Sequence, residues 1–478
     1  MSFSISPLGI KDLPSAPPLR KLLGPSFILL GLGLGSGEVV LWPYMASNYG
    51  LGIVWGMLIG ITMQFFINME VARYALVNGE SVFVGFARLL RWLPIWFIAS
   101  TFLGFGWPGI GLYGASLISK GLGSGHGIQP NTMGIFIFVA IGIILSFGKV
   151  LYKTVEQLQK YLIGICVPLI AVLTYYLATK VDILDLAKGL AGQGVVNGEA
   201  YSFFPPGLIF GTFLGALAYA GAGGNLNLTQ SCYVRDKGYG MGKYAQKITS
   251  LLTAGGASAT FQLSGNTFPI TPENLKRYRH WWRTINSEHL LIFWALGLFT
   301  MLTLSLLAYI TTFGRGDNAT GINFIASEAV AIGQATLPVL GNVFLIITGT
   351  MLAATQLTVL DSTTRIISEN IILLTQGRGS FRVSKVYYLV LWLQILFGIT
   401  VFSLGFDQPL TLIILGAIIN AFSMFVYTGF LLWLNNSVLA KELRPARWRN
   451  FVLMFTFIFF GVFCAVTAYM EFVRWGSQ

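Results

Sequence analysis

Long apolar stretches, separated by shorter polar ones, recur along almost the whole chain. Most are about 17 to 25 residues long or slightly longer, the length that an α-helix needs to cross a bilayer. The pattern predicts an all-α membrane protein with eleven spanning segments. They are residues 24–46, 51–78, 93–119, 132–149, 157–178, 207–234, 289–312, 339–374, 384–404, 409–434 and 450–472. The eighth is longer than a bilayer requires, so we expect it to tilt or to extend into the cytosol.

Glycine-rich runs interrupt two of these segments. The first contains Gly31-Leu-Gly-Leu-Gly-Ser-Gly-Glu38, and the sixth contains Gly221-Ala-Gly-Gly-Asn-Leu-Asn227. Each glycine weakens a helix by roughly 1 kcal/mol relative to alanine. Paired interruptions of this kind point to the substrate site of a secondary transporter, although glycines in membrane helices also simply allow close packing. We expect both helices to be broken, with unwound backbone at Gly33–Gly37 and Gly221–Gly224.

The two interruptions lie five segments apart, and an odd offset inverts the second group of helices relative to the first. We therefore expect two inverted five-helix repeats, about 24–178 and 207–434, within one transmembrane domain (24–474). Residues 450–472 would form an eleventh helix outside the repeats. Residues 1–23 are proline-rich, have no apolar core and are unlike a signal peptide, so we interpret them as a cytosolic lead-in.

Composition and charge support this class of protein. Hydrophobic residues make up 55% of the chain and charged residues only 10%, against about a quarter charged in soluble proteins. The net charge of +12 is concentrated on one side of the expected membrane, since the outside loops carry only Lys120, Lys180, Lys188 and Arg315. This bias sets topology. It predicts a multi-pass protein of the plasma or bacterial inner membrane, with the N-terminus in the cytoplasm and the C-terminus outside, and we expect a monomer.

The longest inside loop, 235–288, contains Tyr278-Arg-His-Trp-Trp-Arg283. Basic residues interleaved with tryptophan bind nucleic acid in some proteins, but beside a membrane they meet anionic lipid headgroups. We expect headgroups, and no nucleic acid, as the partner. The scattered cysteines Cys166, Cys232 and Cys464 have no disulfide or metal-site spacing, and we expect no cofactor.

Ionisable residues inside the spans are few, and their cost makes each a functional candidate. Glu70 and Arg73 lie in segment two; Asp361, Arg365 and Glu369 lie in segment eight. Their spacings of three and four residues place each group on one helix face. We interpret them as structural or gate-forming ion pairs.

Glu38 differs from these residues because no basic residue lies within helical reach of it. A lone acid beside freed backbone attracts a cation or a proton; the alternative is a protonated carboxyl group bonded to a carbonyl. Neutral polar groups around the second break and on segment eight complete a candidate site. They are Asn225, Asn227, Thr229, Gln230, Thr355 and Gln356.

A proton relay through segment three cannot be built, because the chain has no Asp or Glu from Ser81 to Val155. His289 lies at the edge of segment seven, and the other two histidines lie in loops. We therefore expect no proton coupling through that segment.

Four stretches resemble the Nramp (natural resistance-associated macrophage protein) divalent-metal transporters, of the amino acid–polyamine–organocation superfamily. They are Leu23-Gly-Pro-Ser-Phe27, Gln64 through Ala72-Arg73 to Gly79-Glu-Ser81, Asn225-Leu-Asn-Leu228, and Gln356 with Asp361-Ser-Thr-Thr364. The resemblance covers most of the chain in span order. The resemblance implies a leucine-transporter-type fold and transport by alternating access.

The departures from the family fall on its metal site. The family's Asp-Pro-Gly-Asn is Gly35-Ser-Gly-Glu38 here, and its Met-Pro-His-Asn is Ala222-Gly-Gly-Asn225. The metal-binding Asp and Met are thus lost, and a later histidine is Thr229. Glu38 and Asn225 remain as candidate metal ligands. One carboxylate with neutral oxygens suits a partly hydrated Mg²⁺ or Mn²⁺ better than bare Fe²⁺, and we expect little high-affinity transport of Fe²⁺ or Mn²⁺.

Small residues at Gly35, Ala222, Gly223 and Gly224 imply a roomier cavity than the family's. We therefore keep two alternatives to Mg²⁺ transport. One is a small organic solute, amine or amino-acid-like, as the substrate. The other is a transport-inactive membrane receptor or scaffold. We do not expect an enzyme, because no nucleophile–base pair, metal cluster or phosphate-binding loop is apparent.

Overall fold

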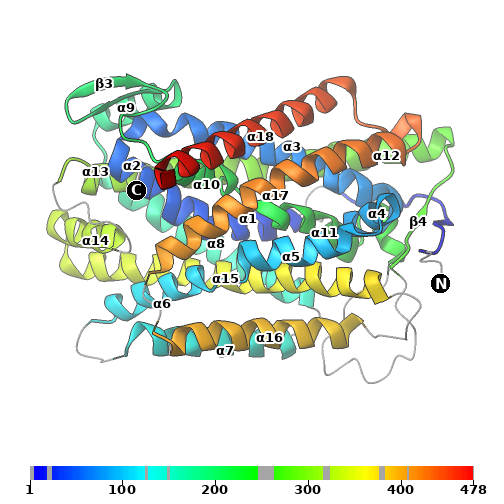
Figure 1. Cartoon of the computed structure of the whole chain (residues 1–478), viewed down its shortest axis with the longest axis horizontal. Coiled ribbons are helices and arrows are strands. Elements are labelled where there is room, and N and C mark those ends of the chain that lie inside the picture. Colours follow the sequence, from blue (N-terminus) through cyan, green and yellow to red (C-terminus); the bar gives the residue numbers. More distant parts are fainter. Residues whose placement is uncertain are drawn as a thin grey trace.

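The structure is a computed structural model that describes residues 5–18, 24–123, 128–147, 151–245, 263–315, 323–375, 383–405 and 408–476. Parts of the predicted lead-in (1–4 and 19–23) and the end of the predicted fourth segment (148–149) lie outside these residues. Most of the described chain is helical, and the long helices form one bundle, as Figure 1 shows.

Among the described residues, ten helical stretches are long and apolar enough to cross a membrane. They are Pro25–Tyr49, Leu51–Asn78, Leu93–Gly121, Pro130–Phe147, Leu151–Leu177, Pro272–Thr312, Pro338–Thr375, Ser384–Ser403, Pro409–Ser437 and Arg447–Met470. They correspond to ten of the predicted segments and identify a multi-pass membrane protein. The other predicted segment, 207–234, holds two short helices, α10 (Phe210–Ala218) and α11 (Thr229–Lys237), so a count of eleven spans stays a prediction.

Several of these stretches combine more than one helical element. In chain order the elements are α1 (Pro25–Gly35), η2 (Ser36–Leu41), α2 (Trp42–Tyr49), η3 (Leu51–Ile53), α3 (Trp55–Asn78), α5 (Leu93–Phe105), α6 (Gly109–Gly121), α7 (Pro130–Phe147), α8 (Leu151–Leu177), α12 (Pro272–His289), η7 (Leu290–Leu296), α13 (Gly297–Thr312), α15 (Pro338–Thr375), α16 (Val383–Ser403), α17 (Pro409–Ser437) and α18 (Arg447–Gly476). Two further short turns are η5 (Gly224–Leu228), which precedes α11, and η8 (Lys441–Leu443).

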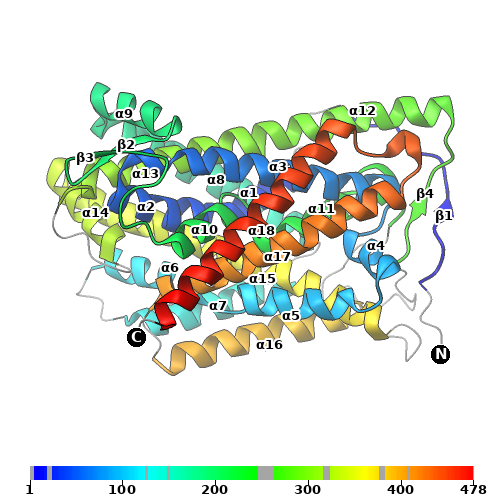
Figure 2. The same ribbon diagram turned by 45° about the horizontal axis from the view of Figure 1, so that its top comes forward.

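Shorter elements lie at the two ends of the bundle (Figures 1 and 2). The N-terminal end carries β1 (Gly9–Ile10), which pairs in parallel with β4 (Asn266–Thr267), together with α4 (Val82–Leu89) and the turn η6 (Gly240–Tyr244). The opposite end carries α9 (Lys180–Leu190), the antiparallel hairpin β2 (Gln193–Val196) and β3 (Glu199–Ser202), and α14 (Asn323–Ala335).

The first segment is not unwound, so that expectation was wrong. Pro25–Tyr49 is continuous, and the glycine run leads into the π-helical turn η2. Such turns widen an α-helix locally and are frequent at functional sites. The sixth segment is unwound as predicted: helix α10 ends at Ala218, and a 3₁₀ turn resumes only at Gly224. Gly223 and Gly224 have φ of 78° and 45°, values that glycine adopts without strain.

Two other segments differ from the prediction. The third is interrupted at residues 106–108, where Pro108 lacks a backbone donor. The seventh begins at Pro272 rather than near 289, so that 278–283, expected in a loop, belongs to α12. Thr271 caps this helix by accepting a bond from the Asn274 backbone N–H at 3.2 Å. The start of α12 is polar, and a search for apolar stretches therefore misses it.

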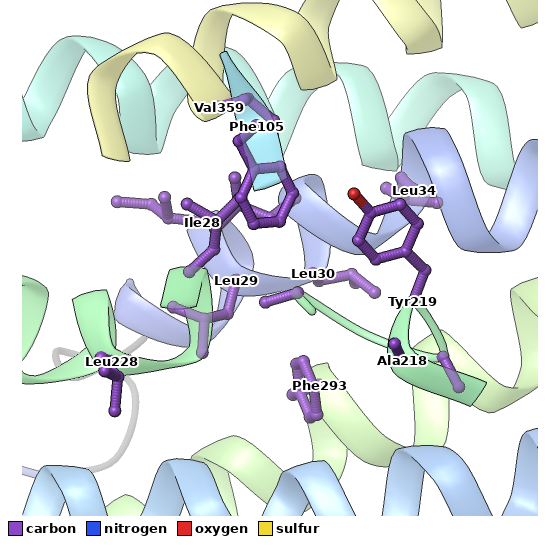
Figure 3. Close-up of a cluster of buried hydrophobic side chains, with 14 of the residues drawn as sticks. Ile28, Leu29, Leu30, Leu34, Phe105, Ala218, Tyr219, Leu228, Phe293 and Val359 are labelled. Carbon is purple, nitrogen blue, oxygen red and sulfur yellow. The ribbon is translucent and has the colours of Figure 1, made fainter. Parts of the chain in front are cut away.

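Segment one lies inside the bundle, with its apolar side chains buried. Figure 3 shows Ile28 and Leu29 among side chains from other segments, including Phe105 from segment three and Tyr219 from segment six. The rings of Phe105 and Tyr219 are stacked, with their centroids 5.6 Å apart. Segment one and the interruptions of segments three and six therefore meet in the core.

Candidate substrate site

The two glycine-rich runs are in direct contact. A methyl group built on Gly37 would overlap the carbonyl oxygen of Tyr219, and one built on Gly33 would lie 3.0 Å from the carbonyl oxygen of Gly221. Backbone therefore packs on backbone where segment one crosses the unwound part of segment six.

Gly31 and Gly35, the other two glycines of the first run, face α8 and α15 instead. Thr355 donates a hydrogen bond from Oγ1 to the carbonyl of Gly31 at 2.9 Å, and a methyl group on Gly35 would lie 2.6 Å from the same hydroxyl oxygen. Gln159 covers Gly31 and donates to the carbonyl of Ala354 at 3.0 Å. All four glycines thus allow close packing, and Thr355 fills the space expected to be open beside Gly35.

Gln64, on α3, stabilises the unwound backbone of segment six. Its Oε1 accepts from the Gly223 N–H at 3.0 Å, and its Nε2 donates to the Ala218 carbonyl at 3.0 Å and to the Leu217 carbonyl at 3.3 Å. Unpaired backbone at membrane depth needs such partners. The sequence signal for this role is an amide in the middle of an apolar segment.

Asn420, on α17, supports the same break from the other side. Its Nδ2 donates to the carbonyl of Gly104 and to the hydroxyl of Tyr219, each at 3.0 Å. A methyl group on Gly224 would overlap the Asn420 side chain, and one on Gly223 would lie against the Tyr219 ring. The roomier cavity expected beside these glycines is therefore filled in this conformation.

Glu38, on η2, is completely buried, and neither carboxylate oxygen has a hydrogen-bond partner among the described residues. Methyl groups built on Gly33 and Gly297 would lie 3.0 Å and 3.5 Å from its Oε1. The carboxylate thus lies between segment one and the start of α13, beside the break of segment six. Burying a carboxylate without a partner is costly, so this position requires a cation or a proton.

The amides that follow the second break have unused acceptors. Asn225 donates from Nδ2 to Ser100 Oγ at 2.7 Å and to Thr101 Oγ1 at 2.9 Å, and Asn227 donates to the Tyr427 hydroxyl at 3.1 Å. The Oδ1 atoms of both asparagines are buried and have no hydrogen-bond partner among the residues that the structure describes. They are the neutral oxygens that the sequence predicted, but neither residue is bonded to Glu38.

The remaining candidate residues differ in whether hydrogen bonds within the fold already use their polar groups. Gln230 is buried, and neither polar atom of its amide has a partner in the described chain. Thr229 donates to the Leu226 carbonyl of its own turn at 2.5 Å. Gln356 accepts from the Gly111 N–H at 3.0 Å, which ties α15 to α6, and Ala222 is buried within the break.

The ion pair expected in segment two is present and is part of a larger group. Arg73 donates from Nε to Glu70 at 2.6 Å, and Arg449 of α18 donates to the same carboxylate at 2.5 Å. Arg73 also donates to the Tyr278 hydroxyl at 2.6 Å, and its guanidinium lies 3.9 Å from the Trp282 ring centroid. The basic aromatic stretch of α12 therefore packs on this ion pair.

The charged side chains of segment eight form ion pairs with residues at the end of segment six. Arg365 bonds both oxygens of Asp361 at 3.0 Å and forms an ion pair with Asp236. Glu369 pairs with Arg235 at 3.1 Å rather than with Arg365. All five side chains are almost completely buried. They join α11 to α15 toward the end of the bundle where the N-terminus lies (Figure 1).

Buried ionisable groups that were not among the predicted candidates include Glu328, Glu288 and His289. Glu328, on α14, is 2% exposed. Glu288 accepts from the N–H groups of Gly24 at 2.9 Å and Ser26 at 3.3 Å, and so caps α1. His289, predicted at a segment edge, is completely buried with its Nδ1 2.9 Å from Ser26 Oγ. Glu288 ends the predicted loop and His289 begins the predicted segment seven, so no apolar pattern pointed to a buried role for either.

Nowhere in the described residues do three or more His, Cys, Asp or Glu side chains come together as metal ligands. The candidate site offers one carboxylate and several amide oxygens, all of them hard donors. Such a set can hold a partly hydrated hard cation or an ammonium group, and it lacks the soft ligands that favour transition metals.

Comparison with known proteins identifies the fold. No sequence-family profile and no curated protein matches the chain. Among solved structures, a mutant of the manganese transporter of Eremococcus coleocola superposes with a TM-score of 0.67 over 96% of this chain and 89% of that chain, at 14% identity. MhsT in complex with L-phenylalanine gives 0.52 over 93% and 97%, also at 14% identity. The chain therefore shares the fold of these proteins, which confirms the fold that the resemblance implied.

Proposed function

We propose that this chain is a membrane transporter that works by alternating access and carries a small hard cation, with Mg²⁺ as the first candidate. The observation that carries the proposal is the buried carboxylate of Glu38, which lies where the two glycine-rich runs meet and has no partner in the described part of the chain. The proposal includes two inverted repeats, a monomer, a cytosolic N-terminal end and an outside C-terminus.

The substrate cation would neutralise Glu38 in the bundle interior. The free Oδ1 atoms of Asn225 and Asn227 would bind its remaining coordination positions, directly or through water. Mg²⁺ dehydrates reluctantly and is usually held by one or two carboxylates with several waters. A site with one acid and neutral oxygens meets that requirement without further charged ligands.

The packing around the glycines favours a small cation over an organic solute. Thr355 and Asn420 occupy the spaces beside Gly35 and Gly224 that a larger substrate would need. Transition metals are disfavoured because the methionine and aspartate of the family that this chain resembles are replaced here. With no acid from 81 to 155, we propose transport without the segment-three proton route.

Opening toward the cytosol would require the buried charges of segments six and eight to separate. Arg365 is held by Asp361 and Asp236, one on each segment. Unpairing a buried charge is costly, so this cluster would act as an inner gate that keeps the present conformation closed at the N-terminal end.

Glu38→Gln tests the role of the carboxylate. The amide keeps the shape of the side chain and removes its charge, so Mg²⁺ binding should weaken by roughly ten- to a hundredfold, equivalent to about 1.5–3 kcal/mol. Isothermal titration of purified protein measures the affinity, and thermal unfolding checks the fold. The melting temperature should be unchanged or higher, because a buried unpaired charge is removed.

Glu328→Gln is the matched control, because Glu328 is also a buried acid whose Oε1 has no partner among the described residues, but it lies on α14. It should bind Mg²⁺ like the parent. Equal affinities of the parent and the Glu38→Gln variant would mean that Glu38 is a protonated packing residue, and the proposed site would be wrong.

A further inference from the structure

A separate cavity of about 500 Å³ lies at the N-terminal end of the bundle. It is partly open to the surface and is lined by the N-terminal segment (12–17), by the end of segment six with η6, and by α12. Among the described residues, its lining contains three cations, Lys237, Lys243 and Arg277, and one acid, Asp12. Its volume is within the range of small-molecule sites, about 300–1,000 Å³.

The N-terminal segment, which forms one wall of the cavity, is hydrogen-bonded to α12. Leu13 is completely buried, its N–H donates to Asn274 Oδ1 at 3.3 Å, and its carbonyl accepts from Arg277 Nη1 at 2.8 Å. The carbonyl of Pro14 accepts from Trp281 Nε1 at 2.7 Å. These contacts come from one face of α12, so the cavity is built by specific bonds.

The same segment is also bonded to the end of segment six. The hydroxyl of Tyr244, in η6, donates to the carbonyl of Asp12 at 3.0 Å. Tyr239 and Trp281, which both line the cavity, have their ring centroids 5.5 Å apart. Three parts of the chain that are distant in sequence therefore share this one cavity.

The cations of the lining differ in how far they are neutralised. Lys237 donates to both oxygens of Glu156, at 2.7 Å and 2.8 Å, which fixes its position. Lys243 is exposed and has neither an ion pair nor a hydrogen bond within the described part of the chain. Arg277 forms an ion pair with Glu273, four residues earlier on α12, and the Asp12 side chain accepts a hydrogen bond from the Asn274 amide at 3.2 Å. Among the described lining residues, Lys243 is therefore the cation that forms no ion pair, and its charge is available to an anion.

We propose that this cavity binds the phosphate group of a cytosolic organic phosphate or of a lipid headgroup. Lysine and arginine are the usual partners of phosphate oxygens, and Lys243 and Arg277 face the cavity from two different walls. A ligand here contacts the N-terminal segment, segment six and α12 together. It therefore stabilises the arrangement in which these three parts are held together.

Binding can be tested on the full chain without any transport assay. The protein is purified in a nonionic detergent with EDTA, and fluorescently labelled ATP is titrated by thermophoresis. Competition with inorganic phosphate and with short-chain phosphatidylglycerol distinguishes the two sources. We expect saturable binding that weakens as salt is raised, and displacement by the phosphate source that the cavity accepts.

Two charge-reversing substitutions distinguish binding in this cavity from non-specific electrostatic attraction to the protein. Lys243→Glu should weaken binding at least about tenfold, because it places a negative charge in the cavity. Lys276→Glu changes the net charge equally, at an exposed position of α12 outside the cavity lining, and should change affinity less than about twofold. Lys243→Arg should retain binding. Absence of saturable binding, or equal weakening by both reversals, would overturn the proposal.

Discussion

Gly37→Ala adds a methyl group at the closest approach of segments one and six. That methyl group would overlap the carbonyl oxygen of Tyr219 and lie 2.6 Å from its carbonyl carbon. The obstacle is backbone, so no side-chain rotation can relieve the clash. Overpacking a core costs about 1–3 kcal/mol. This clash belongs at the upper end of that range, because the break of segment six must move. Alanine regains up to about 1 kcal/mol of helix propensity, which leaves a loss of about 2 kcal/mol.

Gly164→Ala provides the matched comparison. Gly164 lies within α8, and a methyl group there would meet no atom of the described residues within 4 Å apart from its own helix. The same substitution should therefore be neutral or stabilising by up to about 1 kcal/mol.

Thermal unfolding in detergent, followed by tryptophan fluorescence, compares the two variants with the parent. Gly37→Ala should melt several degrees below the parent, and Gly164→Ala at or above it. Substrate binding to Gly37→Ala should also weaken, because its added methyl group pushes the two runs apart beside Glu38. If Gly37→Ala melts and binds like the parent, the contact between the two runs is not as described.

Further predictions concern the buried charges, the break and the selectivity of transport. Arg365→Gln leaves Asp361 and Asp236 buried without their cation and should destabilise the protein by about 3–5 kcal/mol, which denaturation in detergent would measure; an unchanged melting curve would contradict the cluster. Gln64→Leu removes the partners of the Gly223 N–H and the Ala218 carbonyl and should cost about 1–3 kcal/mol for each unsatisfied group, with a parent-like melting temperature as the opposing result. Proteoliposomes should show no saturable micromolar uptake of Fe²⁺ or Mn²⁺, measured by metal analysis. Liposomes loaded with a pH dye should not acidify in step with substrate uptake.

Hydropathy predicts most of the fold because apolar length is a local property of the chain. Ten of the expected segments are present as apolar helical stretches, of which the third is interrupted at 106–108. The start of α12 was missed because its residues are polar and its helix depends on the cap at Thr271. The interruption at 106–108 went unrecognised because a single Gly-Trp-Pro stretch within a long apolar run does not lower hydropathy enough to register.

The glycine runs show what local sequence can and cannot determine. Both reduce helix propensity, yet only the sixth segment is unwound, because Gln64 and Asn420 supply hydrogen bonds and packing around its backbone. The first keeps its own backbone hydrogen bonds through a π-helical turn. Such differences depend on neighbours from distant segments.

The candidate site was predictable in its chemistry and less so in its shape. Glu38 could be identified as a lone acid from the residues near it in sequence, and it is unpartnered among the described residues. The loss of the expected open space beside Gly35 could not be foreseen, since Thr355 reaches it from a helix far along the chain.

The central claim is that the chain moves Mg²⁺ through the site at Glu38. The most direct measurement is Mg²⁺ influx into proteoliposomes that contain a trapped Mg²⁺ indicator, with the parent, Glu38→Gln and Glu328→Gln reconstituted at equal density. The account predicts saturable influx for the parent and for Glu328→Gln, and influx reduced at least about tenfold for Glu38→Gln at subsaturating Mg²⁺. Influx no greater than that of protein-free liposomes, or equal influx for all three proteins, would contradict it.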